Sequence, residues 1–121
     1  MITTQKTLIV EDDAMLGDIF SRALREVDFD ICLVRDGEAA LDWLSEYVPD
    51  LIVLDLHLPI VSGEDVLKYV KNQPRFAHTR VMLVTADAAF GVLLDRQTDL
   101  LLIKPVDVFQ LQRLAQRLKG V

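Results

Sequence analysis

Five short apolar runs recur along the chain, and each is followed by a polar residue. They occupy residues 7–10, 31–34, 51–54, 81–84 and 100–103. Each run is too short for a stable helix and is rich in Val, Ile and Leu, which is typical of strands buried on both faces. We therefore expect five strands of one buried sheet.

Between these runs, apolar residues recur at helical spacing. The inward faces predicted for the first three helices are Leu16, Ile19, Phe20, Ala23, Leu24 and Val27; Ala40, Leu41, Leu44 and Val48; and Val66, Leu67 and Val70. Asp36 is the expected cap of the second helix, and Pro49 prevents its continuation. Ser62 and Gly63 open the third helix, which ends near Pro74.

The last helix is expected to begin after an Asp107 cap and to stop at Gly120. Its predicted inward residues are Val108, Leu111, Leu114, Ala115 and Leu118. Residues 88–98 are less regular, because Gly91 weakens a short helical pattern. Strands that alternate with helices in this way predict an α/β fold, with a parallel sheet covered on both faces. We expect one domain over residues 1–121, without an output domain.

Composition narrows the class of protein. The chain is 51% apolar and 26% charged, which excludes a disordered chain. A net charge of −6 and a pI near 4.7 argue against binding nucleic acid or an anionic membrane through a basic face. Cys32 is the only cysteine, so no disulfide framework exists. With no run typical of a signal peptide or membrane span, we expect a cytoplasmic protein.

Polar groups follow four of the five runs. They are Glu11, Asp12 and Asp13 after the first, Asp55 after the third, Thr85 after the fourth and Lys104 after the fifth. The carboxyl ends of parallel strands share one edge of the sheet, where ligands bind. A lone Asp is more often a cap or turn residue, but four converging strand ends are hard to explain structurally. Clustered carboxylates repel without a cation, and oxygen ligands suit Mg²⁺ or Mn²⁺.

Asp55 is the candidate nucleophile of this edge. The Thr85 hydroxyl and the Lys104 ammonium would make the site complementary to a phosphoryl group. An aspartate carboxylate can attack phosphorus in line and form an acyl phosphate, while Mg²⁺ and Lys104 neutralise the equatorial oxygens. The residues thus indicate phosphoryl transfer to Asp55.

Four sequence motifs carry these residues. They are Leu8-Ile9-Val10-Glu11-Asp12-Asp13, Leu54-Asp55-Leu56-His57-Leu58-Pro59 with Ser62-Gly63, Val84-Thr85-Ala86, and Lys104-Pro105. In this order and at these distances they resemble the receiver domains of two-component response regulators, over essentially the whole chain. The resemblance implies a flavodoxin-like three-layer sandwich with strand order 2-1-3-4-5.

The resemblance implies a role for each site residue. Asp55 would be the phosphoacceptor, Asp12 a direct Mg²⁺ ligand and Glu11 a ligand that more often acts through water. The backbone carbonyl of His57 would complete the protein ligands. Asp13 has no role that the resemblance supplies.

The resemblance also implies how the signal is passed on. Thr85 would bond a phosphoryl oxygen and shift inward, Lys104 would pair with the phosphoryl group, and the Lys104-Pro105 bond would be cis. The donor would be a phosphohistidine on a histidine kinase or a histidine phosphotransfer protein. The output would be a conformational switch read by a partner protein or an attached domain. The domain would catalyse only its own phosphotransfer and dephosphorylation, and is not otherwise an enzyme.

The sequence departs from the family pattern near its fourth helix. Leu101 stands where the family carries an aromatic switch residue, and the span from Thr85 to Lys104 is about one helical turn short. We therefore predict a short or irregular fourth helix and an altered signalling face. His57 and Asp87 would line the approach to the phosphoryl group, where they either tune hydrolysis or are plain loop residues.

Three other functions are compatible with parts of the pattern. A phosphatase of the haloacid dehalogenase type would need a second Asp where this chain has His57. Its nucleophile also follows the first strand, whereas Asp55 follows the third, so both points argue against this function. A flavin or nucleotide binder would want a Gly-rich phosphate loop where this chain has three acids. A receiver-like docking or dimerisation module that has lost switching is the stronger rival, because Leu101 and the shortened segment favour it.

Overall fold

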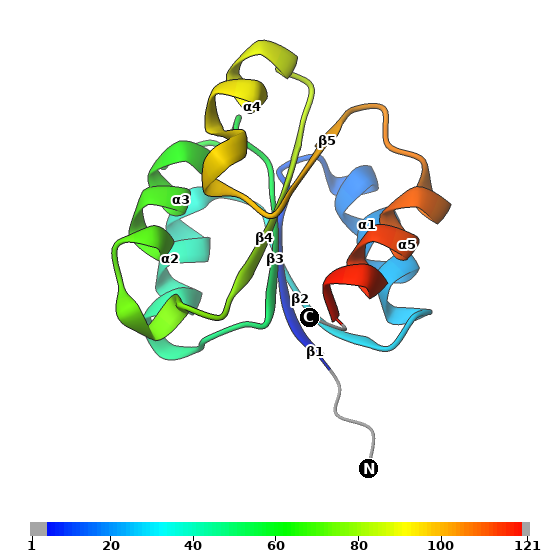
Figure 1. Ribbon diagram of the computed structural model, residues 1–121, viewed down its shortest axis with the longest axis horizontal. Helices are drawn as coiled ribbons and strands as arrows, with labels where there is room; N and C mark the ends of the chain where they lie inside the picture. The colour runs from blue at the N-terminus through cyan, green and yellow to red at the C-terminus, as the bar shows by residue number, and fades with distance from the viewer. Residues whose placement is uncertain (1–4, 120–121) are drawn as a thin grey trace.

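A computed structural model describes residues 5–119 and shows a parallel sheet between two layers of helices (Figure 1). The strands are Gln5–Val10 (β1), Phe29–Val34 (β2), Leu51–Leu54 (β3), Arg80–Thr85 (β4) and Leu100–Ile103 (β5). The helices are Ala14–Arg25 (α1), Gly37–Glu46 (α2), Gly63–Lys71 (α3), Ala88–Leu94 (α4) and Val108–Lys119 (α5), with 3₁₀ turns at Pro74–Phe76 (η1) and Asp95–Gln97 (η2). The strand order is β2-β1-β3-β4-β5, which confirms the predicted fold.

The sheet divides the core into two apolar clusters. Helices α1 and α5 cover one face, and α2, α3 and α4 lie on the other (Figure 1). Leu8 and Val10 of β1 belong to the cluster under α2 and α3, whereas Ile9 between them belongs to the cluster under α1 and α5. The residues of β3 and β4 alternate in the same way. Both faces of these strands are therefore buried, which explains their uninterrupted apolar runs.

The predicted helix caps are confirmed. Asp36 accepts a hydrogen bond from the Ala39 N–H group, and Ser62 accepts one from Asp65. Asp107 likewise accepts from Gln110 at the start of α5. Such caps satisfy backbone donors that the first helical turn leaves without partners. The helices therefore begin where the local sequence places them.

The prediction of an inward-facing side chain is wrong for two residues, Val48 and Ile19. Val48 lies beyond the end of α2 and is exposed, because Tyr47 already has an extended backbone and the residue before Pro49 is disfavoured in a helix. Ile19 of α1 is partly exposed rather than buried. The predicted stop at Gly120 lies outside the described residues.

The strand starts also differ from the prediction. β1 begins at Gln5 and β2 at Phe29, each two residues earlier than their apolar runs suggested. These extra residues pair in register, Gln5 with Phe29 and Lys6 with Asp30. The hydrogen-bond ladder therefore begins at residues that lie outside the continuous apolar runs.

The segment before β5 matches the prediction of a short fourth helix. α4 has seven residues and is followed directly by the 3₁₀ turn η2. The Lys104-Pro105 peptide bond is cis, as expected. None of the described helices has the length and apolar character needed to cross a bilayer.

Candidate functional site

The carboxyl ends of β1 and β3 bring two acidic residues to one edge of the sheet. Val10 pairs with Leu54, so Glu11 and Asp55 follow aligned, neighbouring strand ends. The Glu11 N–H group donates to the Val34 carbonyl at 3.1 Å, and the Asp55 N–H group donates to the Val10 carbonyl at 3.2 Å. The ladder thus continues one residue past each strand and fixes the backbone of both acids.

The Lys104 ammonium lies between these two buried carboxylates. Its Nζ atom is 2.7 Å from Oε1 of Glu11 and 3.0 Å from Oδ2 of Asp55. The backbone N–H group of Lys104 donates to the Thr85 carbonyl at 2.9 Å. This hydrogen bond extends the β4–β5 ladder and positions the backbone from which the Lys104 side chain projects. Because the cluster is largely out of water, its charges interact more strongly than they would at the surface.

Burial and ion pairing shift the pKa values of this cluster. Burial raises the pKa of Glu11 above its usual 4.5, although the hydrogen bond from Lys104 acts in the opposite direction. Burial acts to lower the pKa of Lys104, but its hydrogen bonds to Glu11 and Asp55 outweigh burial and raise that pKa above 10.5. Two carboxylates therefore share one firmly protonated ammonium, and the cluster retains an excess of acidic groups.

Glu11, Asp12 and Asp55 form an oxygen-rich group that suits a hard cation. Each offers a carboxylate oxygen, and the three oxygens lie within 4.8 Å of one another. Asp12 is exposed, whereas Glu11 and Asp55 are buried, so the group is open to solvent on the Asp12 side. Carboxylate oxygens are ligands that Mg²⁺ and Mn²⁺ prefer. Asp13 does not join them, because its carboxylate caps α1 through the Leu16 N–H group.

Thr85 is fully buried at the end of β4, next to the strand that carries Asp55. Its hydroxyl accepts a hydrogen bond from the Asp87 N–H group at 3.1 Å. Glu11, Asp12, Asp55 and Lys104 therefore gather in one cluster, and Thr85 ends the strand beside it. The described structure adds a contact that the sequence did not predict, between His57 Nε2 and Asp87 Oδ2 at 3.1 Å.

Two glycines let the loop that follows Asp55 pack closely. A Cβ atom on Gly63 would lie 2.0 Å from the carbonyl oxygen of Asp55, and one on Gly37 would lie 1.9 Å from that of Val61. Between them, Ile60 adopts a left-handed backbone with a φ of 72°. A β-branched residue is rare in this conformation, so the loop holds it at a cost in energy.

The sequence profile of the response regulator receiver domain matches residues 7–118. The chain belongs to this family. It is 36% identical over 88 residues to the polar-differentiation response regulator DivK of Brucella ovis, a match that covers 73% of this chain and 72% of DivK. The receiver resemblance that four motifs predicted is thus confirmed.

Solved receiver structures share the whole architecture. The signal receiver domain of a putative Luxo repressor protein from Vibrio parahaemolyticus is 30% identical, with a TM-score of 0.86 over 98% of this chain and 92% of that one. The receiver domain of the sensor histidine kinase PA1611 from Pseudomonas aeruginosa PAO1 is 27% identical, with a TM-score of 0.88 over 98% and 100% of the two chains. That structure has a magnesium ion coordinated in its active site cleft.

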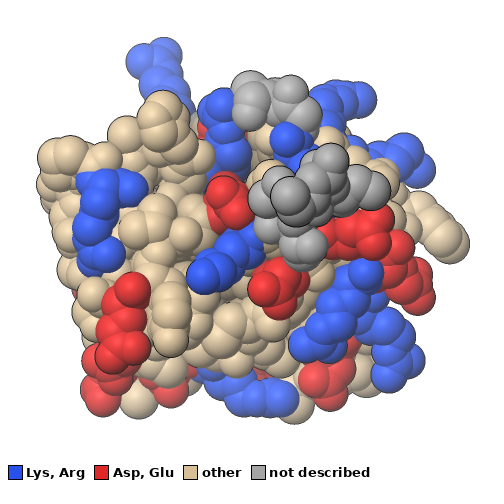
Figure 2. Space-filling view, turned by 90° about the horizontal axis from the view of Figure 1, so that it is seen from below, with Lys and Arg blue, Asp and Glu red and all other residues tan. Residues whose placement is uncertain are grey.

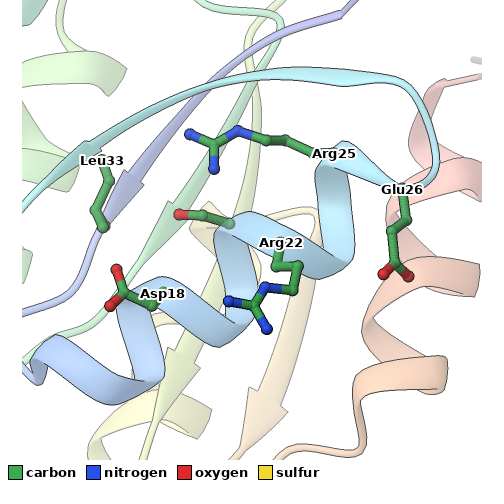
Figure 3. A pocket seen from close by; sticks show the side chains of 6 residues that line it. Asp18, Arg22, Arg25, Glu26 and Leu33 are labelled. Atoms are coloured by element: carbon green, nitrogen blue, oxygen red, sulfur yellow. The ribbon is translucent and has the colours of Figure 1, made fainter.

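A separate hollow of about 390 Å³ lies between α1 and β2 of the receiver domain, away from the acidic edge (Figure 3). Its lining residues are Asp18, Ser21, Arg22, Arg25, Glu26 and Leu33. The Ser21 hydroxyl is buried and lacks a hydrogen-bond partner among the described atoms. The lining carries charges of both signs and includes no residue of the receiver site. We assign this hollow no part in the chemistry.

The underside of the receiver domain, in the view of Figure 2, carries both kinds of charge. Basic and acidic side chains are interspersed across it rather than gathered into one basic surface (Figure 2). This distribution gives no support to binding nucleic acid through this face.

Proposed function

We propose that this receiver domain accepts a phosphoryl group from a phosphohistidine onto Asp55 in a Mg²⁺-dependent reaction, and switches conformation to control a partner protein or an attached domain. The observation that carries the proposal is the buried cluster of Glu11, Asp55 and Lys104, with Asp12 beside it. This cluster combines a nucleophilic carboxylate, excess acidic groups for a cation and an ammonium for a phosphoryl oxygen.

The proposed step is an in-line displacement at phosphorus. A carboxylate oxygen of Asp55 forms the new O–P bond while the P–N bond of the phosphohistidine breaks. The electron pair of that bond leaves with the imidazole nitrogen, which takes up a proton. Lys104 and the Thr85 hydroxyl bind the equatorial oxygens of the transferring group. Because Lys104 already contacts Asp55, it needs little movement to reach a phosphoryl group there.

Glu11, Asp12 and Asp55 would hold the Mg²⁺ ion, together with the backbone carbonyl of His57. When bound, the ion neutralises charge on the phosphoryl oxygens. The donor would be a histidine kinase or a histidine phosphotransfer protein in the cytoplasm. The domain itself would catalyse only its own phosphorylation and dephosphorylation.

The test is intact-protein mass spectrometry after incubation with acetyl phosphate, with and without Mg²⁺. We expect one Mg²⁺-dependent phosphoryl adduct on the wild type and none on Asp55→Asn. Asp42→Asn is the matched control, because Asp42 is an exposed residue on α2. It should be labelled like the wild type. If acetyl phosphate does not label the wild type, the experiment is repeated with a phosphohistidine donor.

A docking or dimerisation module without a switch is the second candidate function. Leu101 and the seven-residue α4 favour it, because both alter the region that the family uses for switching. It predicts no adduct from either donor and partner binding that is unaffected by Asp55→Asn. An adduct on Asp55 together with partner binding that depends on it would exclude this candidate.

A further inference from the structure

A side-chain contact spans the mouth of the site. His57 belongs to the loop after β3, and Asp87 to the loop after β4, 30 positions further along the chain. The 3.1 Å between His57 Nε2 and Asp87 Oδ2 connects these loops at the surface, where 64% of the His57 side chain is exposed. The loop that carries Asp55 is therefore linked to the loop that begins α4.

Asp87 is also the residue that holds the first turn of α4. Its Oδ1 atom accepts a hydrogen bond from the Phe90 N–H group at 3.0 Å, and its carbonyl accepts one from Gly91 at 2.9 Å. Its own N–H group donates to the Thr85 hydroxyl. One carboxylate therefore uses one oxygen to cap α4 and the other to contact His57.

His57, the other partner of this contact, is hydrogen-bonded to Asp55, the proposed phosphoacceptor. The His57 N–H group donates to Oδ1 of Asp55 at 3.2 Å. A continuous set of contacts thus runs from Asp55 through His57 and Asp87 to α4, and Thr85 joins it at Asp87. Both residues that would meet a phosphoryl group, Asp55 and Thr85, lie at the inner ends of this set.

Leu101 fills the space beneath the same helical turn. A Cβ atom on Gly91 would lie 2.9 Å from Cδ1 of Leu101 and 3.2 Å from Cγ2 of Thr85. Leu101 packs against the apolar cluster under α2 and α3. Position 101 carries no aromatic ring to swing, and the polar contacts through His57 and Asp87 provide a connection between the site and α4.

We propose that the His57–Asp87 bridge is a latch that holds the first turn of α4 in its unphosphorylated position and couples that turn to Asp55. His57 acts here as a positioning residue through its side chain, separately from its backbone. The latch itself exists without phosphorylation, and only its signalling role rests on the proposed function.

Phosphorylation would act on both inner ends of the latch. A phosphoryl group on Asp55 changes the acceptor of the His57 N–H group. A Thr85 hydroxyl drawn to a phosphoryl oxygen moves the acceptor of the Asp87 N–H group. The carboxylate that caps α4 then loses its position relative to His57, and the first turn of α4 moves with it.

Amide hydrogen exchange of the unphosphorylated protein tests the latch directly. In His57→Ala, exchange at Phe90 and Gly91 should become about two- to fivefold faster, since exposed ion pairs contribute little individually. His78→Ala is the matched control, because His78 is the other histidine, is exposed and precedes β4, at the end of that strand opposite to Thr85. An internal control is the Gln110 amide, which an Asp107 carboxylate caps in α5.

Two further variants separate the latch from the helix cap. His57→Gln keeps an N–H donor at the end of the side chain and should restore slow exchange in part. Asp87→Ser keeps a short side-chain oxygen that can cap the Phe90 N–H group, but it has no second polar atom to contact His57. It should reproduce the His57→Ala effect, and the double variant should show no further increase.

The signalling role is tested with beryllofluoride, which mimics the phosphoryl group, in the presence of Mg²⁺. The wild type should lose protection at Phe90 and Gly91 on loading, and His57→Ala should change less because its α4 is already released. Unchanged exchange in unloaded His57→Ala would overturn the latch. A latch effect in the unloaded protein with no response to beryllofluoride, and no adduct on Asp55, would instead contradict the proposed function.

Discussion

The two sides of the site mouth differ in how firmly the fold holds them. On one side, Glu11 and Asp55 are 2% and 5% exposed and follow β1 and β3, which are paired on both edges. On the other side, the short α4 leaves Val92 and Leu93 65% and 76% exposed. Glu11 and Asp55, which are proposed for the chemistry, thus sit on the rigid side, and α4, which is proposed for the read-out, sits on the loosely packed side. Such a division suits a switch, because elements that move are drawn from the less stable parts of a fold.

Glycine contacts show the same contrast at atomic scale. A Cβ atom on Gly63 would meet the backbone carbonyl of Asp55 at 2.0 Å, and backbone beside the site cannot yield cheaply. A Cβ atom on Gly91 would meet the end of the Leu101 side chain at 2.9 Å, and a side chain can rotate away. Substitutions on the two sides should therefore have unequal effects.

Removing the ammonium from the rigid side should have the largest effect. Lys104→Met leaves Glu11 and Asp55 buried without their cation, so we expect the free energy of unfolding to fall by about 3–5 kcal/mol in Mg²⁺-free buffer. Urea denaturation measures it, with Lys71→Met on the exposed surface of α3 as the control. Added Mg²⁺ should recover part of the loss. A loss below about 1 kcal/mol would show that the buried pair does not hold this edge together.

The two glycines should respond unequally to alanine. Gly63→Ala forces the loop behind Asp55 to move, and we expect it to lower the free energy of unfolding by about 3 kcal/mol or more. Gly91→Ala should stay within about 1 kcal/mol of the wild type, because better helix propensity offsets the displacement of Leu101. Equal effects of the two substitutions would remove the proposed difference between the two sides.

Alkaline pH should weaken the rigid side. The folded pKa of Lys104 lies above its unfolded value of 10.5, so its contribution to stability is complete below that pH and is lost as pH rises through the folded pKa. The free energy of unfolding of the wild type should therefore fall more steeply above pH 10.5 than that of Lys104→Met. Parallel curves for the two proteins would contradict the assignment.

The smallest effect is expected at Ile60. Its left-handed backbone is unfavourable for a β-branched residue, and its side chain is 73% exposed, so Ile60→Gly should raise the free energy of unfolding by about 1 kcal/mol. Asp28 has a similar φ of 69°, but Asp tolerates this conformation better. Asp28→Gly should therefore stabilise less, and urea denaturation of both variants gives the comparison.

Much of the fold could be predicted because its signals are local. The β-branched runs mark the strands, and Asp36, Ser62 and Asp107 mark helix starts through hydrogen bonds that span three residues. The convergence at the sheet edge also follows, because parallel strands end on the same side. The prediction failed for Val48, which has helical spacing, because the residue before a proline disfavours the helical backbone and α2 ends earlier.

The individual side-chain contacts of the site could not be predicted from the sequence. Lys104 was expected to meet a phosphoryl group, but its 2.7 Å contact with Glu11 depends on how deeply both side chains are buried. His57 and Asp87 were placed at the same approach, yet their contact joins loops 30 residues apart. The short α4 was predicted from a missing helical turn, whereas the packing of Leu101 beneath Gly91 was not.

The most direct test of phosphotransfer to Asp55 is to locate the phosphoryl group. Borohydride reduces an aspartyl phosphate to homoserine, which peptide mass mapping then identifies. After reaction with acetyl phosphate or a phosphohistidine donor in Mg²⁺, we predict homoserine at position 55 and none at Asp12, Asp13 or Asp87. Homoserine at one of those positions in place of 55, or at no position with either donor, would contradict the assignment of Asp55 as the phosphoacceptor.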